Sequence, residues 1–201
     1  AMPEAYYTLS SDKIVIEKGS VIGGVTVQLT DAFFADPLAL STNYVIPILM
    51  TDVVNADSIL SGKALVENPS RTSAADWDLS PKDYILYAVK YINKYDANYL
   101  RRGKDVIKPE VGKDTTITRQ AQWVERDEVV DKISTRNLNT IAWEYTGRDH
   151  NGDARTCTLI LTFNEQGECT INSETAGVTA SGTGRFVVKG EKNSWGRKDR
   201  D

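Results

Sequence analysis

Residues 157–172 read CTLILTFNEQGECTIN, and this stretch decides the fold. Two segments rich in apolar residues flank the sequence NEQG, which is typical of a type I turn that closes on a glycine bulge. Pairing Leu161 with Cys169 and Leu159 with Ile171 places the large apolar side chains of both segments on one face. A slip by one residue would mix threonine into that face. The sequence therefore predicts an antiparallel hairpin with one buried side.

The same register keeps the two cysteines of the chain apart. Cys157 lies four residues along the strand from the predicted partner of Cys169, a separation of about 13 Å at the usual rise per residue. A disulfide requires Cα atoms within about 7 Å. Two cysteines are also too few for a disulfide framework. We therefore predict two buried free thiols.

Strand patterns separated by turn residues recur on both sides of this hairpin. They lie at 13–16, 24–29, 44–50, 63–66, 84–92, 115–124, 139–145, 155–163 and 184–189. This spacing predicts an all-β chain, with a β-sandwich followed by a second antiparallel meander that is sandwich-like or barrel-like. A short helical turn is expected at 31–37. Helical readings remain open for 84–91 and for 125–134.

The polar stretch between residues 93 and 118 is typical of a domain boundary. We place the boundary near residue 106, which divides the chain into domains 1–106 and 107–201.

Composition excludes several classes of protein. The chain of 201 residues is 40% hydrophobic and 26% charged, and it carries a formal net charge of -4. Its acidic balance, with a sequence pI near 5.2, argues against a nucleic-acid partner, because such proteins usually present a clustered basic face. No apolar run approaches the roughly 18 residues of a membrane helix. We therefore expect a soluble protein that does not bind nucleic acid.

Catalytic and metal-binding patterns are weak. The sequence 149–153 superficially resembles a calcium loop, but Ala154 and Ile160 stand where that loop needs glycine and glutamate. We interpret Asn151-Gly152 as a hairpin turn instead. His150 is the single histidine, which excludes most His-based triads and multi-histidine metal sites. We expect no metal site and no cofactor.

Two acids, Asp76 and Asp78, flank a tryptophan. Glycosidase carboxylates face each other across a cleft about 5 to 9.5 Å wide, and closeness in the sequence does not establish that geometry. We therefore expect a protein that is not an enzyme.

Tryptophans are the residues best suited to bind a ligand, because an exposed aromatic ring can stack on a sugar. Trp77 and Trp195 lie among turn residues and are the better surface candidates, and Trp123 is the third. Trp143 alternates with Ile141 and Tyr145 along a predicted strand, so we expect it in the core.

Two longer stretches carry a family resemblance. Residues 27–47 contain VQLTDAFFADPL followed by YVIP, and residues 182–201 contain GTGRF followed by NSWGRKDRD. They resemble exported lipoproteins of Bacteroidetes of the polysaccharide-utilisation type. The first is similar to an N-terminal domain of unknown function, and the second to a C-terminal β domain of unknown function. The resemblance implies an Ig-like β-sandwich followed by a second β domain, but no catalytic residues.

The resemblance also implies a place in the cell. It predicts a periplasmic or cell-surface protein, an outer-membrane lipoprotein whose only membrane contact is a lipid anchor not present in this chain. Relatives continue past residue 201 into another strand, so we expect the C-terminal domain to lack its final strand.

Three functions follow as hypotheses. The first is a non-catalytic cell-envelope protein of a glycan-utilisation system that contacts carbohydrate. The alternative is a structural or partner-docking accessory module of an envelope assembly, whose partner would be another envelope protein. A glycoside hydrolase is the third and least favoured.

Overall fold

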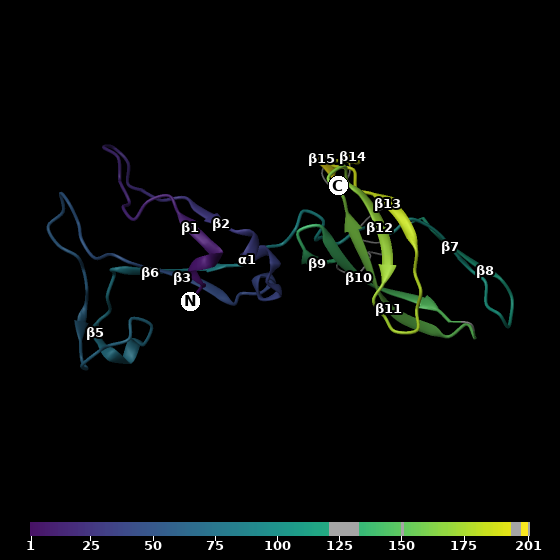
Figure 1. Ribbon diagram of the computed structural model, residues 1–201, viewed down its shortest axis with the longest axis horizontal. Helices are drawn as coiled ribbons and strands as arrows, with labels where there is room; N and C mark the ends of the chain where they lie inside the picture. Colours follow the sequence, from purple (N-terminus) through teal and green to yellow (C-terminus); the bar gives the residue numbers. More distant parts are fainter. Residues whose placement is uncertain (121–132, 150, 194–197, 201) are drawn as a thin grey trace. The chain divides into compact units, whose positions relative to one another are not determined.

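The computed structural model describes residues 1–120, 133–149, 151–193 and 198–200. Strands dominate it, and all the strand pairs are antiparallel, which confirms the expected all-β class (Figure 1). The chain divides into two compact units, Ala1–Tyr91 and Ile92–Asp201. None of the helices in the described part of the chain is long and apolar enough to cross a membrane.

The first unit contains short elements. In chain order these are η1 (Glu4–Tyr6), β1 (Tyr7–Leu9), β2 (Val27–Leu29), α1 (Asp31–Ala35), η2 (Pro37–Leu40), β3 (Tyr44–Leu49), β4 (Lys63–Ala64), η3 (Ala74–Asp76), β5 (Trp77–Leu79) and β6 (Tyr84–Val89). The described strands form three two-stranded sheets, β1–β2, β3–β6 and β4–β5. This pairing is simpler than the two packed sheets that the resemblance implied.

Phe33 on α1 is the centre of the core in this unit, with an exposed fraction of 0%. Its ring contacts those of Tyr6, Tyr44 and Tyr91 at centroid distances of 5.9 to 6.2 Å. A helix of five residues is not stable alone, so α1 depends on the packing of the Phe33 side chain in this core.

A carboxylate locks the end of α1 to this core. Asp36 accepts hydrogen bonds from the hydroxyl groups of Tyr6 and Tyr44 and from the backbone N–H of Leu38. The hydrogen bond from Tyr44, together with those from Leu38 and Tyr6, lowers the pKa of Asp36 below its usual range. The same carboxylate raises the pKa of Tyr44.

The ribbon formed by β3 and β6 is apolar on both faces. Tyr44 and Ile46 are buried at one end, where they meet the core. Large apolar side chains remain exposed over the rest of the ribbon, namely Leu49, Ile85, Leu86 and Tyr87. Strands that are apolar on both faces are typical of sheets covered on both sides.

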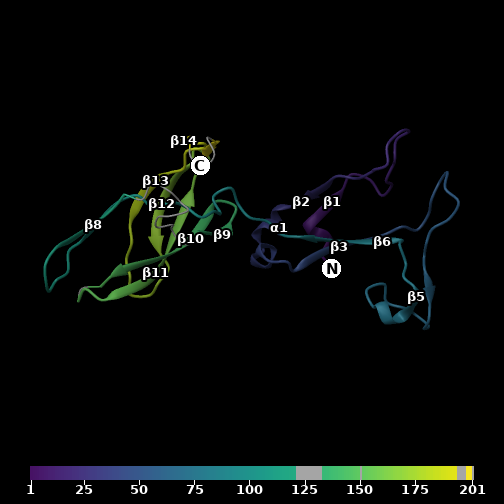
Figure 2. The same ribbon diagram turned by 180° about the vertical axis from the view of Figure 1, so that it is seen from behind.

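The second unit is built around a meander. Its strands are β7 (Gly103–Ile107), β8 (Thr115–Arg119), β9 (Ser134–Asn137), β10 (Thr140–Arg148), β11 (Ala154–Phe163), β12 (Glu168–Ser173), β13 (Gly182–Arg185), β14 (Glu191–Asn193) and β15 (Lys198–Arg200). One sheet has the order β13-β12-β11-β10-β9, while β7–β8 and β14–β15 form separate hairpins (Figures 1 and 2).

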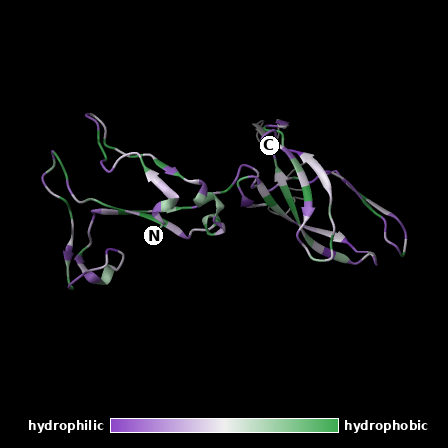
Figure 3. Cartoon of the chain, in the orientation of Figure 1, coloured by the Kyte–Doolittle hydropathy of each residue, from purple (hydrophilic) through white to green (hydrophobic). Residues whose placement is uncertain are grey.

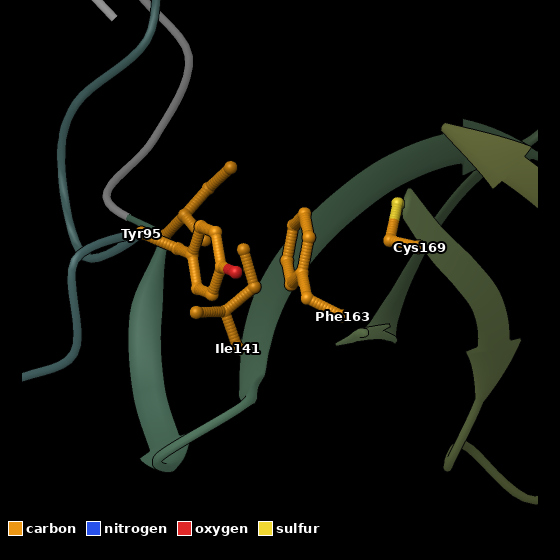
Figure 4. Close-up of a cluster of buried hydrophobic side chains, with 5 residues drawn as sticks. Tyr95, Ile141, Phe163 and Cys169 are labelled. Carbon is orange, nitrogen blue, oxygen red and sulfur yellow. The ribbon is translucent and has the colours of Figure 1, made fainter. Parts of the chain in front are cut away.

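Hydrophobic residues recur along the strands of the five-stranded sheet (Figure 3). Its core lies on one face, where the ring of Tyr95 stacks on that of Phe163 at 3.8 Å with the planes 12° apart (Figure 4). Ile141 and Cys169 are buried beside this pair. The core therefore joins three strands of the sheet to a segment that precedes them in the chain.

The boundary between the units falls earlier than residue 106, after Tyr91. The physical reason is Asn93, which is buried in the second unit. Its amide donates to the carbonyl oxygens of Asn137 and Thr140, and its backbone N–H donates to the hydroxyl of Thr135. Asn93, at the start of the polar stretch, therefore belongs to the core of the second unit and not to a linker.

The 157–172 hairpin forms with the predicted apolar face but in a register two residues away. Cys169 pairs with Phe163 and Ile171 with Leu161. The turn closes through a hydrogen bond from the N–H of Gly167 to the oxygen of Asn164, with Gly167 at a φ of 79°. Pairing therefore continues up to the turn. The face is unchanged because a shift of two residues preserves the alternation.

Three other predictions have mixed outcomes. Both cysteines are free, as predicted, but only Cys169 is buried and Cys157 is half-buried. The strand expected at 13–16 does not form, and these residues are exposed. A hairpin turn lies where Asn151-Gly152 predicted one, with Gly152 at a φ of 87°, but it is longer than a two-residue turn, because the N–H of Asp149 donates to the oxygen of Asp153 across it. His150 lies outside the described residues.

Candidate functional site

Of the three tryptophans that the sequence nominated, Trp77 lies within the described residues, while Trp123 and Trp195 lie outside them. Trp77 begins β5 and is half-buried. Its indole N–H donates to the carbonyl oxygen of Ser70 at 2.8 Å. Gly62 approaches its ring so closely that a Cβ there would lie 3.0 Å from it. Trp77 is therefore fixed within its own loop.

The acids on either side of Trp77 have separate structural partners. Asp76 accepts hydrogen bonds from the N–H of Ser70 and the hydroxyl of Ser73, and these hydrogen bonds lower its pKa. Asp78 forms an exposed ion pair with Lys63 at 2.6 Å. The two carboxylates thus stabilise different contacts and do not act as a facing pair.

The more suggestive aromatic surface lies on β10. Trp143 and Tyr145 are both half-buried and lie on the same face of the strand, beyond the buried Ile141. Their ring centroids are 5.2 Å apart and the ring planes are inclined at 73°. Gly147 leaves room for the Tyr145 ring, because a Cβ there would lie 2.8 Å from it. We call Trp143 and Tyr145 the aromatic platform.

An arginine from outside the sheet covers this platform. The guanidinium carbon of Arg101 lies 5.3 Å from the ring centroid of Trp143 and 4.8 Å from that of Tyr145. These distances are within the range of a cation–π interaction. Its Nη2 atom also donates to the Oδ1 of Asp105 at 2.5 Å. The second oxygen of Asp105 accepts from Arg119 at 2.9 Å.

The polar atoms of the platform are available to a ligand. Among the described residues, neither the indole N–H of Trp143 nor the hydroxyl of Tyr145 forms a hydrogen bond with the protein, and no buried polar side-chain atom lacks a partner. Both groups therefore reach water. This distinguishes Trp143 from Trp77, whose N–H is already bonded.

The arrangement can bind a flat or puckered apolar face beside a polar group, a combination that suits a sugar ring. No group of three or more metal-ligating side chains occurs in the portion of the chain that the structure describes. What the platform offers chemically is therefore recognition through the ring edges that Arg101 leaves exposed and through hydrogen-bond donors.

Sequence reasoning assigned Trp143 to the core and so missed this site. The alternation of Ile141, Trp143 and Tyr145 correctly placed all three on the core face. Trp143 is half-buried and packs against the core that contains Ile141, so its expected place in the core is confirmed in part. The sequence carries no signal for the contact with Arg101, because only the fold brings this residue to β10.

Comparison with known proteins gave three findings. Residues 94–201 match the model of DUF5627, a domain of unknown function. Residues 1–57 match the model of an N-terminal domain. A crystal structure from Bacteroides ovatus, described as structural genomics of unknown function, is similar to this chain with 50% identity and a TM-score of 0.87. A search of curated proteins found no match.

The Bacteroides ovatus structure covers 98% of this chain, while the chain spans 62% of the length of that structure. These findings confirm the expected combination of an N-terminal domain and a domain of unknown function of the Bacteroides type.

Proposed function

We propose, from the premise that this chain belongs to the DUF5627 family, that it is a non-catalytic cell-envelope protein of a glycan-utilisation system that contacts carbohydrate. The resemblance to exported lipoproteins of Bacteroidetes supports an envelope setting, and the similar crystal structure comes from Bacteroides ovatus, a member of that bacterial group. We place the protein in the periplasm or at the cell surface, as a lipoprotein.

The aromatic platform is the observation that carries the carbohydrate contact. Trp143 and Tyr145 combine half-buried ring surfaces with an N–H and a hydroxyl that reach water. Sugar rings present C–H groups on one face and hydroxyl groups at their edges, so they match a surface of this composition. Arg101 and Gly147 fix the ring positions in advance, which lowers the entropy cost of binding.

Affinity gel electrophoresis with a panel of neutral and acidic polysaccharides tests the proposal. We expect at least one polysaccharide to retard the protein. Trp143→Ala should weaken this binding by about tenfold, which corresponds to roughly 1.4 kcal/mol. Trp77→Ala is the matched control, since it removes a half-buried tryptophan from the other unit.

Two results would overturn the proposal. One is no retardation of the unmodified protein by any polysaccharide. The other is loss of binding in the Trp77→Ala variant with normal binding in the Trp143→Ala variant, which would return the site to the loop that contains β5. Fractionation of native cells tests the location, and recovery of the protein in the cytoplasm would contradict it.

The β3–β6 ribbon favours a second candidate function, a partner-docking accessory module of an envelope assembly. Its exposed apolar residues occupy both faces, with Ile85 and Tyr87 on the face that carries Ile46 and Leu86 on the opposite face. Exposed apolar patches often mark protein interfaces. A pull-down from native envelope that recovers a stoichiometric partner, lost in the Leu86→Asp variant, would support this function. Recovery of the same material by the variant would contradict it.

A further inference from the structure

The available polar groups around the aromatic platform are predominantly hydrogen-bond donors. Arg101 and the indole of Trp143 have donors only, and the hydroxyl of Tyr145 can act in either sense. The nearest carboxylate, that of Asp105, already accepts hydrogen bonds on both oxygens, from Arg101 and Arg119. A ligand on this surface therefore has to supply the acceptors.

Arg101 keeps donors for such a ligand. Its guanidinium group has five N–H donors, and one of them, on Nη2, bonds to Asp105. Its side chain is 18% exposed, and none of the buried polar atoms in the described residues lacks a partner. Among the described residues, Asp105 is the hydrogen-bond partner of this side chain, and the remaining N–H groups have no second one. Contacts with two rings and one carboxylate hold the group in place without using these donors.

A second arginine projects from the same face of the sheet. Arg155 on β11 is paired with Gly147 across the strands, so its side chain leaves the sheet on the side that carries Tyr145. It is 69% exposed, with its Nε atom 3.8 Å from a carboxylate oxygen of Asp149. The edge of the platform is therefore lined by a guanidinium group as well.

We propose that the platform binds acidic glycans, with a sugar ring packed against the ring edges of Trp143 and Tyr145 that Arg101 leaves exposed, and its carboxylate held by Arg101. A carboxylate accepts two parallel hydrogen bonds from one guanidinium group, which fixes orientation as well as position. Uronic acids are sugars of this chemical class. The inference rests on the proposed carbohydrate contact and specifies which carbohydrates the same site takes.

The sharpest test compares a glycan that carries carboxylates with the same glycan after its carboxylates are esterified. Oligogalacturonate and its methyl ester have the same sugar rings and linkages, but the ester has lost the carboxylate. Isothermal titration with the full chain should show that the acid binds at least about tenfold more tightly than the ester. Added salt should reduce this preference, because the contact is partly exposed. Dextran sulfate is titrated in parallel, to test whether a sulfate can replace the carboxylate.

Variants at two arginines separate a specific contact from general charge. Arg101→Gln should remove the preference for the acid over the ester. Arg136→Gln is the matched control, since Arg136 also has one carboxylate partner, Glu174 at 2.6 Å, but lies on β9 and contacts neither ring. It should keep the full preference. If Arg101→Gln fails to fold, Tyr145→Phe keeps the ring, removes one polar group and should weaken binding of both ligands.

The outcomes distinguish the preference for acidic glycans from carbohydrate binding itself. Equal binding of acid and ester, or tight binding of neutral glycans alone, would overturn the acidic preference and leave the carbohydrate contact standing. Binding of dextran sulfate without oligogalacturonate would overturn the carboxylate assignment. No binding of any acidic or neutral glycan would count against both proposals. An unchanged preference in Arg101→Gln would refute the role of this residue.

Discussion

Substitution of Phe33 by alanine should unfold the first unit selectively. The side chain is fully buried among aromatic rings, and Phe→Ala in a core costs about 3–5 kcal/mol through lost burial and the cavity left behind. For a unit of the size of Ala1–Tyr91, each kcal/mol lowers the melting temperature by about 4–8 °C. We therefore expect a decrease of about 20 °C, measured by calorimetry.

The comparison with Phe163→Ala makes this prediction specific. Phe163 occupies the core of the second unit, so its substitution should spare the first. Hydrogen exchange followed by mass spectrometry resolves the two, because it assigns protection to peptides. If Phe33→Ala increased exchange in the peptides of β10 and β11 as strongly as in those of β3, two separate cores would be the wrong description.

Three further predictions follow from single residues. Because the pKa of Asp36 is lowered in the folded state, its contribution to stability should be present above the unfolded pKa of about 3.9 and lost as pH falls through the lower folded value. In acid unfolding followed by circular dichroism, the stability of Asp36→Asn should therefore fall less steeply with decreasing pH than that of the unmodified protein. Equal slopes for the two proteins would contradict this expectation. Gly167→Ala should destabilise the hairpin by about 1–2 kcal/mol in urea unfolding. It combines positive φ with a Cβ 3.0 Å from a backbone oxygen, whereas Gly152→Ala has strain without a clash and should cost less. Native thiol titration should show Cys157 reacting before Cys169, whose pKa is raised by burial. Equal rates would contradict this order.

Side-chain alternation was the reliable part of the sequence reasoning. It correctly predicted the buried face of the 157–172 hairpin, because burial fixes which residues share a side. It did not predict the register, since Cys169 opposite Leu161 or opposite Phe163 satisfies the same alternation. The choice depends on how tightly the turn closes, which here is determined by the hydrogen bonds of Asn164 and Gly167.

Predictions that depended on long-range contacts were less successful. Asn93 is a polar residue in a polar stretch, and only its distant partners Thr135 and Thr140 make it part of a core. Trp143 was placed on the correct face, but the extent of the core along β10 depends on where Tyr95 packs. The site arises because residue 101 returns to that strand, and no local pattern contains this information.

The order β13-β12-β11-β10-β9 has a consequence for folding kinetics. Each strand of this sheet pairs with its neighbour in the sequence, so most of the sheet can form through short loop closures, which favour rapid folding. The aromatic stack, in which Tyr95 lies parallel to Phe163 and meets Phe186 edge to face, joins positions far apart in the chain. During synthesis the ribosome would release the hairpins one by one, while the aromatic stack must wait until Phe186 has emerged.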